Sequence, residues 1–211
     1  MNRQGTLACA VAGVAMVVAL GTPAMTQDEF AADAARLVKA LKISPGQAIA
    51  DIGAGAGQLT VALAAVVGPS GRVYGTELNA DRLRAIRKGA DAAGLKNVTA
   101  IEGHATRTNL PENCCDVLVV RFVYHHFDDP GLMNASLRQS LKPGGLLAII
   151  DFPPDGTESA NPAGRSDGEQ HGVTPATVAR ELKEAGLEPV LVEEGVRRTS
   201  FLVVMRRPLR R

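Results

Sequence analysis

The stretch that most constrains the fold is residues 49–57, with the sequence IADIGAGAG. A short apolar run ends in the acid Asp51, glycines follow at positions 53, 55 and 57, and the next residues are mostly apolar without a helix breaker. Glycine permits a tight turn and leaves room for a ligand against the backbone. The pattern therefore predicts a buried strand that turns into a helix, with a ligand at the junction.

A second apolar run, residues 72–77, ends in Glu77. An acid about twenty residues beyond such a turn is where the ribose hydroxyls of a nucleoside are usually held. Together the two runs predict an adenosine-containing ligand.

Spacing decides between the possible adenosine ligands. The dinucleotide fingerprint needs a glycine at position 58, where the chain has Gln58, and the third glycine comes one residue early. Asp51 at the mouth of the turn would repel a pyrophosphate but suits a ligand that carries ammonium and sulfonium charges. An NAD-dependent oxidoreductase is therefore only a third hypothesis.

The order of elements predicts an α/β fold: a Rossmann-like, doubly wound, mostly parallel seven-stranded sheet. The two last strands share a short connection, so one strand near the C-terminus should run antiparallel. The expected strands are 48–52, 72–78, 98–102, 116–120, 146–150, 187–193 and 200–205, and the expected helices are 27–41, 57–67, 80–93, 130–141 and 174–185. Asn79 or Asp81 is expected to cap the third helix and Thr174 the last one.

The amino terminus has the pattern of a secretory signal. Arg3 precedes an apolar run from Leu7 to Leu20, and small residues follow up to Ala24. The run is shorter than the roughly 20 residues of a membrane span. We expect a signal peptide over residues 1–24, a domain over 25–211, and export, to the periplasm in a bacterium. Translation from Met25 would instead give a cytoplasmic protein.

Composition narrows the partners. The formal net charge is +1, and the chain has two Tyr, five Phe and no Trp, so no aromatic, basic face for nucleic acid is expected. A small-molecule or lipid-like partner is preferred, with no stable membrane span after signal cleavage.

Four motifs in order resemble those of the class I S-adenosylmethionine-dependent methyltransferases. They are the glycine run with its acid at 51–57, VYGTEL at 73–78, DVLVVRFVYHHF at 116–127 and LKPGGLL at 141–147. The subgroup most similar in appearance is the small ubiquinone/menaquinone-biosynthesis methyltransferases, in which a His-His-Phe triplet also follows the fourth strand. The resemblance implies methyl transfer from S-adenosylmethionine to a small or lipid-like acceptor. A non-catalytic, exported binding module with the same fold is the alternative.

The resemblance also implies a set of cofactor-binding residues: Asp51, Gly53, Ala54, Gly55, Glu77, Leu78, His104, Ala105, Arg121 and Phe122. Glu77 would accept both ribose hydroxyls, and Arg121 and Phe122 would lie beneath the cofactor near the methyl group. Family members commonly place an acid after the third strand for the adenine amino group, but this chain has His104 there. Either the neutral imidazole or a backbone group would have to replace that acid.

Candidate catalytic residues are Tyr124, His125 and His126, because an oxygen nucleophile can need a base and histidine is well tuned for one. Adjacent side chains point in different directions, so at most one of the two histidines is expected to face the pocket. The alternative for either is a structural hydrogen bond.

Asp151, Phe152 and His171 are candidates for the acceptor side, although Asp151 could simply cap the sheet. The long connection 155–172 is interpreted as a substrate loop or lid, with a disordered insertion as the alternative. A metal site built from His104, His126, Asp151 and His171 lacks any recognisable ligand spacing, and we predict no metal.

Overall fold

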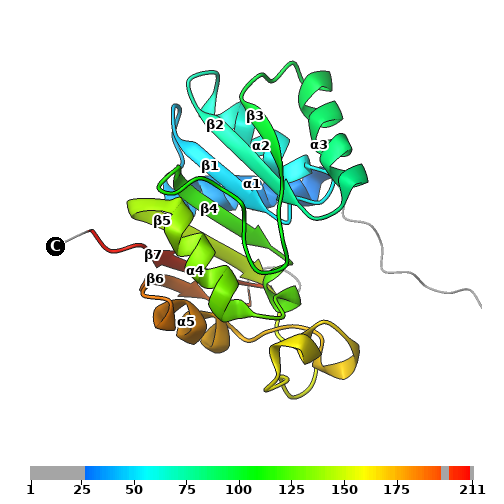
Figure 1. The fold of residues 1–211 in the computed structure, drawn as a ribbon, viewed down its shortest axis with the longest axis vertical. Coiled ribbons are helices and arrows are strands. Elements are labelled where there is room, and N and C mark those ends of the chain that lie inside the picture. Colours follow the sequence, from blue (N-terminus) through cyan, green and yellow to red (C-terminus); the bar gives the residue numbers. More distant parts are fainter. Residues whose placement is uncertain (1–26, 196–199, 210–211) are drawn as a thin grey trace, which may run out of the picture.

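The computed structural model describes residues 27–195 and 200–209 as one α/β domain around a seven-stranded sheet (Figure 1). The strand order is β3-β2-β1-β4-β5-β7-β6, and only β7 runs antiparallel to the others. The strands are β1 (Ala48–Ile52), β2 (Arg72–Glu77), β3 (Val98–Glu102), β4 (Cys115–Arg121), β5 (Leu141–Asp151), β6 (Glu188–Glu193) and β7 (Phe201–Arg206). The predicted fold class and the antiparallel strand are confirmed.

Helices cover both faces of the sheet, as Figure 1 shows with α4 and α5 in front and α1 and α2 behind. The helices are α1 (Gln27–Leu41), α2 (Gln58–Val67), α3 (Ala80–Ala92), α4 (Pro130–Ser140) and α5 (Pro175–Glu184). Each face has its own apolar core, and the central strands contribute alternate side chains to the two. Because both faces are covered, β4 reads as a continuous apolar run in the sequence.

Side chains cap the helices where the sequence indicates. Asn79 accepts the backbone N–H groups of Asp81 and Arg82 at the start of α3, and Thr174 accepts that of Thr177 at the start of α5. Gly57 was expected to be the first helical residue but is the residue before α2, with a left-handed φ of 90°.

The expected strand 146–150 begins earlier than predicted, because residues 142–145 lie inside β5. The β4–β5 register shifts from Cys115 opposite Leu141 to Val117 opposite Leu146, so the extra residues form a bulge. Gly144 and Gly145 exchange backbone hydrogen bonds with Arg207 beyond β7, which keeps this segment extended. The sequence shows the two glycines but gives no indication that Arg207 is their hydrogen-bond partner.

The connection 155–172 is folded, with two short 3₁₀ helices, η2 (Pro162–Arg165) and η3 (Gly168–Gln170). A third, η1 (Tyr124–His126), follows β4, and none of the three was predicted. The expected signal peptide lies outside the described residues. Within residues 27–195 and 200–209, the helices are too short or too polar to cross a membrane.

Candidate functional site

The loop between β1 and α2 has the backbone shape that the glycines predict. Gly53, Gly55 and Gly57 all have positive φ, at 68°, 58° and 90°. A Cβ atom at Gly53 would come within 2.6 Å of the Val123 side chain, whereas one at Gly55 would meet no atom within 4 Å. The loop therefore packs tightly against the end of β4 and leaves open space above Gly55.

Glu77 stands at the carboxyl end of β2, facing this loop. Its Oε2 accepts the N–H of Gly55 at 2.9 Å, and its Oε1 accepts the N–H groups of Leu78 at 2.8 Å and Asn79 at 3.3 Å. Three backbone donors thus fix the direction of a largely buried carboxylate. Such a preorganised acceptor suits a ligand with paired hydroxyl groups.

Asp51 lies deeper than the resemblance implies. It is only 2% exposed and accepts the Thr60 hydroxyl at 2.7 Å. Burial raises its pKa to about 6, against smaller lowering effects from the Thr60 hydrogen bond and the Arg121 charge. Asp51 therefore shapes the loop from below and contributes charge at a distance.

Arg121 is directed towards α1. Its Nε donates to Asp33 at 2.7 Å, and its guanidinium lies over the rings of Phe30 and Phe122 at 4.6 and 4.5 Å. It ties α1 to the end of β4. Phe122 itself has a φ of 55°, a conformation that is strained for a bulky residue and that often marks a functional site.

A cavity opens at the carboxyl ends of β1, β2 and β4, where sheets of this kind bind ligands. Its lining residues are Ile52, Gly53, Thr76, Glu77, Leu78, Gly103, His104, Ala105, Arg107, Thr108, Val123, His126, Phe127, Asp128 and Met133. Five of the predicted cofactor residues are among them: Gly53, Glu77, Leu78, His104 and Ala105. Asp51, Ala54, Gly55, Arg121 and Phe122 are not, although Gly55 joins the site through Glu77.

His104 lines this cavity from a small turn after β3. Its backbone N–H donates to the carbonyl of Arg107 at 2.9 Å, and a return bond at 3.3 Å closes the turn. Sequence reasoning missed the other residues of this wall and the floor, among them Arg107, Thr108 and Met133. Nothing in their local pattern distinguishes them, because the β3–β4 connection and α4 bring them to the cavity.

The two adjacent histidines do point differently. His125 is 2% exposed, and its Nδ1 lies 2.8 Å from Oδ1 of the buried Asp151. His126 is exposed and lines the cavity. Burial, together with the nearby His125 and His171, lowers the pKa of His126, so its ring is neutral at pH 7 and able to accept a proton.

The acceptor-side candidates also come together. Asp151 accepts the backbone N–H groups of His125 and Phe152 as well as the His125 ring, so it orients this segment from within the fold. The Phe152 ring packs 4.9 Å from His125 and 5.1 Å from His171. His171 Nε2 lies 3.1 Å from His125 Nε2.

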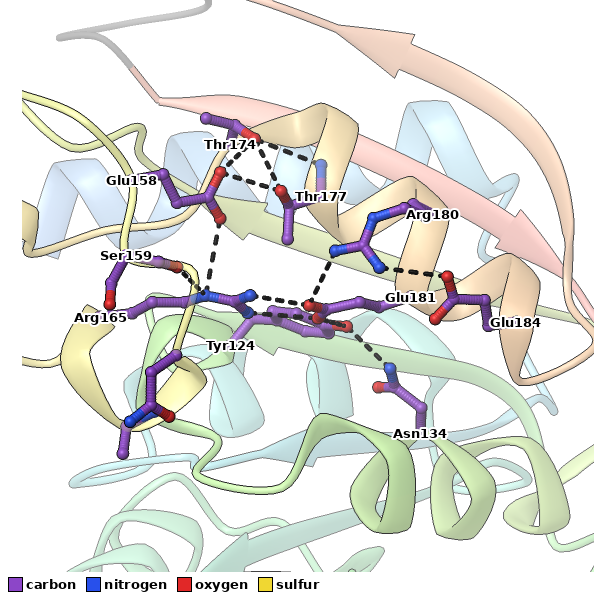
Figure 2. Close-up of polar contacts among 12 residues, drawn as sticks. Tyr124, Asn134, Glu158, Ser159, Arg165, Thr174, Thr177, Arg180, Glu181 and Glu184 are labelled. Carbon is purple, nitrogen blue, oxygen red and sulfur yellow. Dashed lines mark hydrogen bonds and ion pairs between the residues drawn. The ribbon is translucent and has the colours of Figure 1, made fainter.

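Tyr124 belongs to a different network, shown in Figure 2. Its hydroxyl donates to Glu181 at 3.0 Å and accepts from Asn134 at 2.8 Å, and burial raises its pKa. Glu181 also binds the guanidinium of the buried Arg165, which reaches from η2 between α5 and Glu158. The network anchors the 155–172 loop, and the Tyr124 hydroxyl takes no part in the cavity.

Comparisons with known proteins agree with this fold and site. A family model described as a methyltransferase domain matches residues 50–149. The chain is 28% identical over 115 residues to the demethylmenaquinone methyltransferase of Geobacillus stearothermophilus, covering 54% of this chain and 49% of the relative. It is 32% identical over 109 residues to the ubiquinone/menaquinone biosynthesis C-methyltransferase UbiE of Vibrio cholerae, covering 51% and 42%. The chain thus spans about half the length of the curated relatives it matches.

The structural similarity to known proteins covers more of the chain than the sequence similarity does. A crystal structure of an S-adenosylmethionine-dependent methyltransferase from Aquifex aeolicus superposes with a TM-score of 0.71 at 23% identity, covering 87% of this chain and 99% of that one. The chain therefore has the Rossmann-like fold of the class I S-adenosylmethionine-dependent methyltransferases, and residues 50–149 match the family model of a methyltransferase domain. Within that class it resembles the UbiE-type enzymes of quinone biosynthesis.

Proposed function

We propose that this chain transfers a methyl group from S-adenosylmethionine to a small or lipid-like acceptor with a hydroxyl-bearing ring. One observation carries the proposal most directly: the preorganised carboxylate of Glu77 faces a cavity closed on one side by the glycine loop. The open space above Gly55, where an added Cβ would meet no atom within 4 Å, supports a ligand at this position. The curated relatives named for quinone biosynthesis support an acceptor of the quinol type.

The residues of the site suit an adenosyl sulfonium ligand. Glu77 would hold the ribose, and the turn at Gly103–Ala105 would border the adenine with backbone groups and the His104 ring. When bound, the cofactor supplies an electrophilic methyl group. The buried Asp51 adds negative potential below a ligand that carries positive charge.

The protein would contribute mainly alignment. In-line displacement gains most from holding the two partners in register. The Phe152 ring packs against the rings of Phe122 and His171, and we propose that this aromatic cluster helps to position the acceptor. Aromatic faces can stabilise a sulfonium by cation–π attraction. His126, exposed at the cavity, is the histidine placed to take a proton from an acceptor hydroxyl.

Formation of S-adenosylhomocysteine tests the proposal. The full chain would be incubated with S-adenosylmethionine and a panel of phenols, quinols and aliphatic alcohols, with product detected by mass spectrometry. We expect turnover with ring hydroxyl compounds and its loss in Glu77→Gln, but not in Glu102→Gln, which changes the exposed acid paired with Glu77 in the neighbouring strand. Cofactor binding without turnover on any acceptor would instead support a binding module.

We also propose that residues 1–24 direct export, on the basis of the apolar run from Leu7 to Leu20. Mass spectrometry of the mature amino terminus would give a start after Ala24. A start at Met1, or mature protein found only in the cytoplasmic fraction of the cell, would overturn the proposal.

A further inference from the structure

Three of the four histidines in the chain gather at one point beside the cavity. His125 and His126 come from η1 and His171 from the end of the 155–172 loop, and one ring nitrogen of each lies within 4.8 Å of the others. We propose that these three histidines bind one divalent transition-metal ion with a coordination position open towards the cofactor cavity. The sequence prediction of no metal is thereby replaced, and His104 and Asp151 are not among the ligands.

The distances suit a shared ion. Zinc binds histidine nitrogen at roughly 2.0–2.1 Å, so two nitrogens on a tetrahedral ion lie roughly 3.3 Å apart. The Nε2 atoms of His125 and His171 are 3.1 Å apart. The His126 ring lies tilted by 46° against His125 with centroids 4.0 Å apart, and one of its nitrogens lies within 4.8 Å of those of His125 and His171.

Asp151 prepares His125 for metal binding. An ionised carboxylate only accepts, so its contact with Nδ1 makes that nitrogen the N–H donor and leaves the lone pair on Nε2, towards His171. A carboxylate behind a histidine ligand is the usual second layer of a metal site, where it fixes the tautomer and raises ligand basicity. Asp151 is fully buried and held by two backbone N–H groups, so it has no freedom to turn away.

The chemistry of the donors selects the class of metal. Imidazole nitrogens suit zinc, cobalt, nickel, copper and iron, whereas magnesium and calcium require oxygen ligands. The Phe152 ring packs against His125 and His171 and shields one side of the cluster. Three histidines with an open fourth position resemble catalytic rather than structural zinc sites in their ligand count.

The role of the ion rests on the proposed function. Because His126 also lines the cavity, a metal bound by the three histidines would lie beside the proposed cofactor site. A hydroxyl oxygen on the open position would lose its proton near neutral pH, since a bound cation lowers the pKa of its oxygen ligand. His126 would then bind the metal instead of acting as a free base, and the metal would promote loss of the proton from the acceptor hydroxyl.

The alternative is a chain of hydrogen bonds without metal. In that arrangement His171 Nε2–H donates to His125 Nε2, and Asp151, His125 and His171 form a relay. The two arrangements use the same distances, so the measurement must detect the ion itself.

Cobalt binding to the full, tag-free chain distinguishes them. Co²⁺ would be titrated without S-adenosylmethionine, and the visible absorption bands of low-coordinate cobalt followed to saturation. We expect one ion per chain, without the near-ultraviolet charge-transfer band that cysteine sulfur gives. The affinity should fall by about 100-fold or more in His171→Ala and in His126→Ala, and by about 10–100-fold in Asp151→Asn.

His104→Ala is the matched control and should bind cobalt as the wild type does. Circular dichroism establishes whether each variant is folded. If His171→Ala and Asp151→Asn do not fold, His126→Ala decides the question, because His126 is exposed. Absence of stoichiometric cobalt binding, or equal binding by wild type and His126→Ala, would overturn the site. A parallel titration of metal-free protein with S-adenosylhomocysteine reports on the proposed function separately, because Glu77 and the glycine loop do not contact the histidines in the structure.

Discussion

Two neighbouring regions at the carboxyl edge of the sheet are built in different ways. The cofactor side consists of the glycine loop and Glu77, and backbone hydrogen bonds hold it together. The histidine side depends on the 155–172 loop, which side-chain contacts from Arg165 to Glu158 and Glu181 hold in place. The residues of the first region are close together in the sequence and border a cavity, whereas those of the second come from distant parts of the chain.

Substitutions in the two regions are therefore expected to affect different properties, ligand binding in the first and stability in the second. A backbone-held loop can present a ligand site with few side chains, so its substitutions should change cofactor affinity more than stability. A loop held by buried charges should respond in the opposite way, because removal of one charge leaves its partners buried without compensation. Each prediction below tests one side of this contrast.

The largest effect on stability is expected at Arg165. Its guanidinium is 3% exposed and bridges Glu158 and Glu181, so Arg165→Gln should lower the free energy of unfolding by about 3–5 kcal/mol. Urea unfolding measures the loss. Arg180→Gln is the matched control, since Arg180 contacts Glu181 and Glu184 at the surface, and it should cost less than about 1 kcal/mol. Equal losses in the two variants would contradict the buried anchor.

A smaller effect is expected at Asp51 and depends on pH. Its pKa rises on folding from 3.8 to about 6, so the native chain keeps a proton on this carboxyl that the unfolded chain has already lost. A native state that binds more protons loses stability as pH rises. The wild type should therefore lose about 3 kcal/mol from this group between pH 3.8 and about 6, and little beyond.

Asp51→Asn removes this titration. Urea unfolding of both proteins across that pH range should give a difference that grows with pH in favour of the variant. A difference that stays constant, or that grows as pH falls, would show that Asp51 is not a protonated, buried carboxyl in the native chain.

The smallest effect is expected at Tyr124. Tyr124→Phe removes the hydroxyl between Asn134 and Glu181 and should lower the free energy of unfolding by about 1–2 kcal/mol. Cofactor affinity should stay unchanged, because the hydroxyl lies outside the cavity. A large loss of turnover with unchanged stability would instead indicate that the Tyr124 hydroxyl takes part in catalysis.

Local patterns predict much of this molecule. The glycine spacing and the acid at position 77 predict the local geometry of the proposed cofactor side because each effect acts within a few residues: left-handed turns at Gly53 and Gly55, and a carboxylate at a strand end. Apolar runs and helix caps likewise predict nearly every strand and helix, since both signals are local in the sequence.

The sequence does not predict what depends on distant contacts. The neighbours of His125 are Asp151 and His171, and only the folded sheet and the 155–172 loop bring them to one point. For the same reason the spacing of the histidines in the sequence does not predict that they cluster. Arg165 carries no signal in the sequence, because its partners lie on the same loop and on α5.

Calorimetric titration of S-adenosylhomocysteine into the wild type, Gly55→Ala and Gly68→Ala tests whether the cofactor binds against the glycine loop. Both glycines have positive φ, at 58° and 65°, and neither has atoms within 4 Å of an added Cβ. Gly68 also has a ψ of −174°, a conformation essentially restricted to glycine, so Gly68→Ala should lose about 1–3 kcal/mol of stability, at least as much as Gly55→Ala. Only Gly55 faces the proposed cofactor site. The account predicts that Gly55→Ala weakens binding by about tenfold or more, as a clash of about 1–3 kcal/mol gives, and that Gly68→Ala binds normally. Equal affinity in all three proteins, or no binding to the wild type, would contradict it.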